Sequence, residues 1–297
     1  MKQLSATLLL TFRELWAMKI TQGIFVVTTI AWLLLTFALN LDVIEGSVAA
    51  LRIFGFESSP LEAARNPETG AILRDAETGR AVREALSLEQ FVLGINSFVF
   101  GASYLFGTLL GLFATMPLIS GFVEQGRIDL MLSKPLSRAK LLTGHIIGVW
   151  TIVVMLVAYL VGAVWLVISF KTGIWLPRFL LSIPLIVVMF GVMYSIVLTI
   201  GVSARSTGLA LVTAYGCVFF SAILAGKDQI LPQLSDAAAT VFIGLYHVIP
   251  NYIEVIAIIS QLAEGEPVNS WYPLISSMLF GVIVYAIGFL IFSRKDY

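Results

Sequence analysis

Charged residues and cysteine are scarce in this sequence. Only 12% of its 297 residues are charged, and eighteen basic side chains balance eighteen acidic ones. This neutral balance gives no reason to expect a nucleic acid as a partner. The single cysteine, Cys217, lies within an apolar run. A lone cysteine excludes both an intrachain disulfide framework and a cysteine-rich metal site.

The common motifs of nucleotide-binding and hydrolytic sites are also missing. No G-x-x-x-x-G-K-[ST] phosphate loop occurs, and the nearest fragment, AGKD at residues 225–228, lacks the upstream glycine and the final hydroxyl. Neither H-E-x-x-H nor G-x-S-x-G is present, and the two histidines, His145 and His247, are far apart in the sequence. We therefore expect no cofactor, no metal site and no catalytic residues in this chain, which disfavours an intramembrane enzyme.

Apolar residues, by contrast, dominate the composition. They make up 59% of the chain, and the mean hydropathy of +0.95 is far above that of soluble proteins. A run of about twenty apolar residues spans a hydrocarbon layer as a helix. The sequence therefore predicts an all-α integral membrane protein with six transmembrane helices, at residues 20–39, 91–123, 141–170, 179–202, 209–225 and 272–292.

Two further segments are expected to be membrane-associated without crossing. Residues 1–19 place apolar side chains at helical spacing, which favours an amphipathic interfacial helix over a frayed extension of the first span. Residues 236–262 are interrupted by Pro250 and carry Glu254, and each half is too short to cross. We expect a re-entrant helical hairpin there, rather than a seventh span.

The basic residues predict the orientation. With both termini on the cytoplasmic side, that side carries Lys2, Arg13, Lys19, Arg127, Lys134, Arg138, Lys140, Arg205, Arg294 and Lys295. The short segments on the opposite side carry only Lys171, Arg178 and Lys227. Because short cytoplasmic loops are enriched in lysine and arginine, this asymmetry predicts that both termini are cytoplasmic.

The segment at residues 40–90 is the one part that resembles a soluble protein. It follows the first span and repeats an E-T-G triplet at Glu68 and Glu77, with Gly70 and Gly79 as turn signals. We expect a small extracytoplasmic loop domain with a β-hairpin, followed by a helix that leads into the second span. A loose polar loop is the alternative.

Within the predicted spans, ionisable residues are almost absent, which counts against an ion-coupled secondary carrier. Glycine pairs at four-residue spacing, Gly107 with Gly111 and Gly144 with Gly148, allow helices to approach closely. Helix packing, within or between subunits, is the preferred interpretation of these pairs. The alternative is a path for a substrate lined by small residues.

The segment between the second and third spans, GFVEQGRIDLMLSKPLSRAK at residues 121–140, predicts a short cytoplasmic helix. Gly126 is placed to end the second span and Pro135 to stop the short helix. Asp129 in its first turn and Lys134 at its end complement the helix dipole. Ser137 is expected to N-cap the third span. An apolar face on such an element suits a docking site for another protein.

The stretch EQGRIDLMLSKPLSR resembles the signature of ABC-2 type transporter permeases, the membrane subunits of ATP-binding cassette transporters. The resemblance extends over almost the whole chain, through the SARSTG turn at residues 203–208 to the ending FSRKDY. The longer outer segment is similar to that of the nitrous-oxide-reductase maturation permease subgroup. The residues that match the signature are Glu124, Gly126, Ile128, Leu132, Pro135, Ser137 and Arg138.

This resemblance implies a function, a site and partners. Residues 124–140 would be the coupling helix that inserts into the ATP-binding subunit, with Glu124, Arg127 and Asp129 as polar anchors and Ile128, Met131 and Leu132 as an apolar plug. Ser203, Arg205 and Ser206 would form a second cytoplasmic contact. The expected complex has two ATP-binding subunits, which bind ATP and magnesium, and two permease copies in a prokaryotic plasma membrane. An extracytoplasmic protein at the outer loop is a further expected partner.

Two other functions stay open at this point. One is a non-transporting anchor or sensor that binds a partner through the outer loop, and the other is the ion-coupled carrier already disfavoured by the apolar spans. The transported substrate, its direction and the choice between homodimer and heterodimer are not indicated by any residue pattern.

Overall fold

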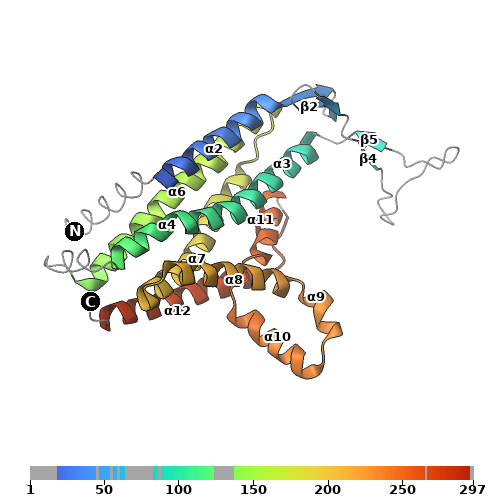
Figure 1. Cartoon of the computed structure of the whole chain (residues 1–297). Coiled ribbons are helices and arrows are strands. Elements are labelled where there is room, and N and C mark those ends of the chain that lie inside the picture. Colours follow the sequence, from blue (N-terminus) through green and yellow to red (C-terminus); the bar gives the residue numbers. More distant parts are fainter. Residues whose placement is uncertain are drawn as a thin grey trace.

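The computed structural model describes residues 19–44, 47–53, 56–58, 61–63, 83–85, 88–123, 137–264 and 266–294 (Figure 1). The predicted interfacial helix and most of the predicted coupling helix lie outside these residues. The long helices are α2 (Lys19–Ala38), α3 (Leu88–Ala102), α4 (Thr108–Val123), α6 (Arg138–Thr172), α7 (Ser182–Ala204), α8 (Thr207–Ala225) and α12 (Tyr272–Arg294). The shorter ones are η1 (Ser103–Gly107), η2 (Pro177–Leu181), α9 (Lys227–Ile230), η3 (Leu231–Gln233), α10 (Asp236–Val248) and α11 (Glu254–Glu264).

Short strands occupy part of the segment between α2 and α3. The strands β1 (Leu39–Ile44), β2 (Ser47–Ile53) and β3 (Phe56–Ser58) form an antiparallel sheet in that order. A second antiparallel pair joins β4 (Leu61–Ala63) to β5 (Arg83–Ala85). Of the stretch with the repeated E-T-G triplet, only its end at β5 is among the described residues. The strands are thus confined to the predicted outer domain, and the apolar part of the described chain is helical.

Five helical segments in the described part of the chain are long and apolar enough to cross a membrane. They are Val92–Met116, Arg138–Thr172, Pro177–Ala204, Thr207–Ala225 and Tyr272–Arg294. The helix α2 has 20 residues, which corresponds to about 30 Å, but its apolar stretch at Gln22–Leu34 is shorter than a full span. By length and composition, the structure therefore supports five of the six predicted spans.

A single turn of π-helix, η1, interrupts the helix that runs from Leu88 to Val123. Hydropathy predicted one span over residues 91–123 and gave no sign of this irregularity. A π-turn inserts one extra residue into the helical turn, and such turns occur frequently at functional sites. The side-chain faces of α4 therefore do not continue those of α3, as they would in one regular helix. The π-turn rotates one relative to the other.

The centre of the helical bundle is α7. Of its most apolar stretch 78% is buried, against 22–44% for the other four candidate spans. It contacts α4, α6, α8 and α12, and in Figure 1 it lies between the α2, α4 and α6 group and the α8 and α12 group. Phe190, Met193 and Tyr194 on this helix are at most 1% exposed. The long apolar run at residues 179–202 is thus an interior helix, not one that mainly faces lipid.

Glycines allow the neighbours of α7 to approach its backbone. A Cβ atom added to Gly191 would lie 2.0 Å from the ring of Trp150 on α6. On α12, a Cβ on Gly288 would lie 2.6 Å from the hydroxyl of Thr199, and one on Gly281 would lie 3.1 Å from Val192. Both α12 contacts have the same sequence offset, so α7 and α12 run parallel. In a lipid bilayer, whose interior is as apolar as the helix surfaces, helices associate through close packing of this kind.

The glycine pair Gly107 and Gly111 behaves differently at its two positions. A Cβ atom on Gly111 would lie 3.1 Å from the ring of Phe190, as expected for close helix approach. A Cβ atom on Gly107 would meet no atom within 4 Å. The packing interpretation is therefore confirmed within the chain at Gly111, whereas Gly107 contacts no other described helix of the same chain.

The substitution Gly191→Ala tests the packing of α7. The new methyl group would overlap Trp150, and overpacking of this kind costs roughly 1–3 kcal/mol. We expect a lower melting temperature of the purified protein in detergent and a smaller yield of inserted protein. In the control Gly216→Ala the added Cβ meets no atom within 4 Å, so its melting temperature should not fall. A melting temperature of Gly191→Ala equal to that of the control would contradict this account.

Candidate functional site

Five of the predicted site residues are described by the structure: Ser137, Arg138, Ser203, Arg205 and Ser206. The other eight lie outside the described residues: Glu124, Gly126, Arg127, Ile128, Asp129, Met131, Leu132 and Pro135. The described residues sit at two places, the start of α6 and the turn between α7 and α8.

The start of α6 is held in two ways. Ser137 has extended backbone angles, and its hydroxyl accepts a hydrogen bond from the Lys140 amide at 3.4 Å, so it is the N-cap that the sequence predicts. The Arg138 side chain donates to the Ser293 carbonyl at 3.3 Å. This bond ties the first turn of α6 to the last turn of α12, two segments 155 positions apart in the chain.

The turn between α7 and α8 is short and conformationally defined. Arg205 ends α7 with a φ of 51°, in the left-handed region. Ser206 N-caps α8 by accepting a hydrogen bond from the Leu209 amide at 3.3 Å, and Ser203 donates to the Ile200 carbonyl at 3.2 Å. Both serine hydroxyls therefore serve the helix termini, which leaves Arg205 as the distinctive side chain of the turn.

These two places lie at the same end of the bundle, together with the ends of α4 and α12 (Figure 1). The parallel register of α7 and α12, in which Thr199 faces Gly288, brings the end of α7 beside the last turn of α12. The Arg138 bond brings the start of α6 to that same turn. The structure thus gathers the described residues of both predicted cytoplasmic contacts around the end of α12.

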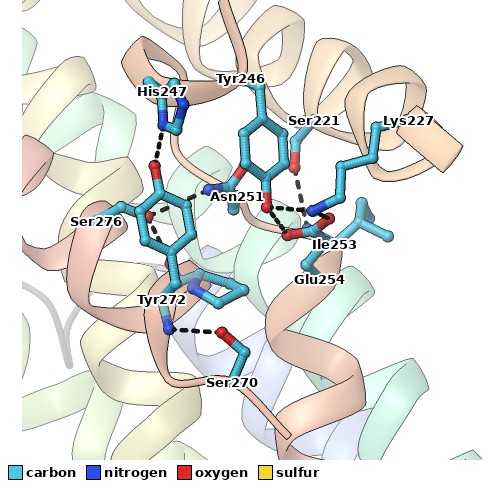
Figure 2. Close-up of polar contacts among 11 residues, drawn as sticks. Ser221, Lys227, Tyr246, His247, Asn251, Ile253, Glu254, Ser270, Tyr272 and Ser276 are labelled. Atoms are coloured by element: carbon cyan, nitrogen blue, oxygen red, sulfur yellow. Dashed lines mark hydrogen bonds and ion pairs between the residues drawn. The ribbon is translucent and has the colours of Figure 1, made fainter. Parts of the chain in front are cut away.

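A polar network occupies the region where α9, α10 and α11 meet (Figure 2). The ammonium group of Lys227 lies 3.3 Å from one carboxylate oxygen of Glu254 and donates to the hydroxyl of Tyr246 at 2.7 Å. That hydroxyl donates to the other carboxylate oxygen at 2.6 Å. Lys227 also lies 4.2 Å from the centre of the Tyr246 ring. The three side chains form a closed triangle that joins three helices.

The break between α10 and α11 is anchored to α8 and α12. The amide of Asn251 donates to the hydroxyl of Ser277 at 2.9 Å, and its side chain donates to Ser276 at 3.2 Å. The amide of Ile253 donates to Ser221 on α8 at 3.1 Å. The predicted helix break at Pro250 is therefore present, and serines on two neighbouring helices satisfy backbone groups at this break.

Hydropathy missed a tyrosine pair that joins this break to the π-turn. Tyr104 in η1 donates to the Tyr252 carbonyl at 2.6 Å, and Tyr252 donates to the Tyr104 carbonyl at 2.7 Å. The two rings are stacked with their centres 4.5 Å apart, and both side chains are fully buried. The π-turn is thus bonded to the segment after Pro250, because the buried Tyr104 carbonyl accepts a hydrogen bond from the Tyr252 hydroxyl as well as from the Thr108 amide.

The polar network changes the ionisation of two of its members. Partial burial lowers the pKa of Lys227, but the hydrogen bond that Lys227 donates to Tyr246 and the charge of Glu254 outweigh it, so the pKa rises above 10.5. Burial, and then the hydrogen bond to Glu254, raises the pKa of Tyr246. Lys227 therefore stays charged and Tyr246 stays neutral throughout the neutral range.

Each of the two histidines lies against a tyrosine hydroxyl. His145 lies 3.0 Å from the hydroxyl of Tyr194, and His247 hydrogen-bonds the hydroxyl of Tyr272. In the described ranges, no three side chains of His, Cys, Asp or Glu come together in a way that holds a metal ion. Both histidines therefore take part in hydrogen bonds with tyrosines of neighbouring helices.

One protein family matches the chain over almost its full length. The family model is described as "ABC-2 family transporter protein", and it covers residues 16–297. No curated protein and no solved structure matched the chain.

The substitution Lys227→Met tests the polar network. It should destabilise the protein by roughly 0.2–1 kcal/mol at neutral pH, the range of partly exposed ion pairs. Because folding raises the pKa of Lys227, the stabilisation is present below pH 10.5 and is lost as the pH rises further. We expect the melting temperatures of wild type and variant to converge above that pH. The control Asp228→Asn, at an exposed neighbouring position, should melt like wild type, and a constant difference at alkaline pH would contradict the assignment.

Proposed function

We propose that this chain, which belongs to the ABC-2 family of transporter proteins and is thus a membrane permease component of an ABC transporter, couples ATP hydrolysis on a separate subunit to the export of a substrate. The observation that carries the proposal is the family match over residues 16–297. The partner subunit would bind the ATP and magnesium, since this sequence has no phosphate loop. Two such subunits would act on two permease copies.

The topology that we propose has six crossings. It counts α2, whose 20 residues are about 30 Å long, together with the five longer apolar segments. An even number of crossings puts both termini on one side, and the distribution of basic residues makes that side cytoplasmic. The proposed location is the plasma membrane of a prokaryote. The outer segment, residues 40–90, would face away from the cytoplasm, where we propose a protein partner as in the nitrous-oxide-reductase maturation subgroup.

The proposed coupling route begins at residues 124–138. This segment leads directly into α6, an uninterrupted helix of 35 residues that is about 52 Å long. A helix of this length exceeds the hydrocarbon layer, so one end extends beyond it or the helix is tilted. Movement of the ATP-binding subunits would shift the start of α6, and the Arg138 bond to α12 would carry the shift to a second helix. Packing against α7 would then spread it through the bundle.

The double substitution of Ile128 and Leu132 to Asp tests the coupling site. It should leave insertion and the melting temperature of the permease unchanged, and should abolish both co-purification of the ATP-binding subunit and transport-linked ATP hydrolysis, because charges would enter an apolar contact. Glu124→Ala should weaken the same readouts. The control Lys134→Ala alters a charge in the same segment without touching the proposed contact. If the double variant stimulated ATP hydrolysis as wild type does, the coupling assignment would be wrong.

The substitution Arg205→Gly tests the second contact without straining the turn. Glycine adopts the left-handed conformation of Arg205 freely, so the backbone of the turn is not strained, and we expect a loss of roughly 1.5–3 kcal/mol in binding to the ATP-binding subunit, as for one charged hydrogen bond. The matched variant Arg205→Lys, which keeps the charge, should retain most of the affinity. If wild type and both variants bound the ATP-binding subunit with equal affinity in a pull-down titration, Arg205 would not be part of the contact.

A further inference from the structure

A buried hydrogen bond joins α6 to the interior helix α7 close to the start of α6. Nε2 of His145 lies 3.0 Å from the hydroxyl oxygen of Tyr194. His145 is 5% exposed, and Tyr194 is fully buried. Because α6 begins at Arg138, His145 lies about 10 Å along this helix, or roughly two turns from its start. The bond is therefore close to the segment that would contact the ATP-binding subunit.

The ring of Tyr194 belongs to a stacked pair on α7. It lies against the ring of Phe190, one turn earlier, with the ring centres 5.7 Å apart. The Phe190 ring also contacts α4, where a Cβ atom added to Gly111 would lie 3.1 Å from it. The helices α4 and α6 come directly before and after the proposed coupling segment. Both of these helices thus meet α7 at the same aromatic pair.

The hydrogen bonds of α6 to other helices divide along its length. In its first half, Arg138 and Trp150 donate to groups on α12, and His145 bonds to α7. In its second half, Tyr159 bonds to two side chains of α2. A shift of the first half of α6 would therefore act directly on α7 and α12, the two helices that pack most closely at the centre of the bundle.

A hydrogen bond transmits such a shift differently from an apolar contact. Its strength falls steeply when the distance or the angle leaves the normal range, whereas individual apolar contacts are weak and have no preferred direction. A buried hydroxyl that loses its partner is costly in apolar surroundings. Movement of His145 would therefore either carry Tyr194 along or break a bond that is expensive to lose.

We infer that His145 and Tyr194 are the positioning residues through which α6 moves α7 when the ATP-binding subunits close. The inference rests on the proposed function, in which the segment between α4 and α6 contacts those subunits. The His145–Tyr194 bond fixes the position of α7 relative to the start of α6. The stack of Tyr194 on Phe190 links the same point to α4. The two helices on either side of the coupling segment thus act on the interior helix at one level.

Cysteine labelling of the whole complex tests the inference without a known substrate. The permease, with Cys217→Ser as background, is placed in lipid nanodiscs with its co-expressed ATP-binding subunit. A single reporter cysteine replaces either Thr143 on α6 or Ser182, the buried first residue of α7. The readout is the ratio of maleimide labelling rates with ATP and vanadate to those without nucleotide. We expect ATP to change the labelling rate at both reporters.

The variant Tyr194→Phe removes the hydroxyl and keeps the ring that stacks on Phe190. The ATP-dependent change at Thr143→Cys should stay as in wild type, and most of the change at Ser182→Cys should be lost, because one hydrogen bond corresponds to a roughly fivefold shift between two states. His145→Leu should have the same effect, and the double variant should lose no more than either single one, since all three remove one bond.

Two further variants separate transmission from a merely structural role. His145→Gln, whose carboxamide can still bond the Tyr194 hydroxyl, should keep the change at Ser182→Cys. Thr151→Val is the matched control on α6, since the exposed Thr151 hydroxyl donates to the Ile147 carbonyl of its own helix at 2.8 Å. It should label like wild type at both reporters. A bond that served stability alone would lower the melting temperature and leave both labelling changes in their wild-type proportion.

The possible outcomes distinguish the inference from the proposed function. The inference is overturned if Tyr194→Phe and His145→Leu both keep the wild-type change at Ser182→Cys. It is equally overturned if ATP changes the labelling of wild type at Thr143→Cys and not at Ser182→Cys. If the ATP-binding subunit did not co-purify, or ATP changed neither reporter, the proposed function would be contradicted, and the inference with it.

Discussion

The close packing of α7 against its neighbours is the constraint on which the rest of the structure depends. Lipid tails are as apolar as leucine, so burial of apolar surface gives helices no reason to leave the lipid for one another. Association depends instead on backbones that approach closely, and here Gly191, Gly281 and Gly288 provide that approach. The indole of Trp150 donates to Tyr285 at 3.3 Å, and the Tyr285 hydroxyl donates to the Gly191 carbonyl at 2.9 Å. Close contact and hydrogen bonds therefore hold α6, α7 and α12 as one unit.

This unit positions both polar ends of the molecule. At one end, the parallel register of α7 and α12 brings the α7–α8 turn beside the last turn of α12. The Arg138 bond brings the start of α6 to the same place. At the other, serines on α8 and α12 hold the break between α10 and α11, and the ion pair of Lys227 with Glu254 joins the helices around it. Between the two ends the interior of the bundle is mostly apolar. A displacement at one end is thus carried by packed helices, since no chain of charged groups in the described spans links the two.

The side of the bundle formed by α2, α4 and α6 lacks this close packing. Gly107 has open space where Gly111 contacts Phe190, and the π-turn that contains Gly107 shifts the helix faces at this level. The reciprocal bonds of Tyr104 and Tyr252 hold that turn in place from the opposite face. A cavity persists here because the irregular helix is stabilised by the hairpin, not by a neighbour that would fill the gap. Of the two glycines at this spacing, Gly111 therefore packs against α7 and Gly107 faces the cavity.

Hydropathy and local chemistry by themselves determined the membrane class, the long helices, the Ser137 cap, the hairpin around Pro250 and the family, because each depends on residues close in the chain. They did not reveal that α7 is the interior helix, since a run of apolar residues is the same whether lipid or protein surrounds it. Nor did they reveal the π-turn, the Lys227 triangle or the open side of Gly107. Those features were decided by the tertiary structure, because each depends on which distant residue lies opposite, and spacing along one helix carries no information about its neighbour.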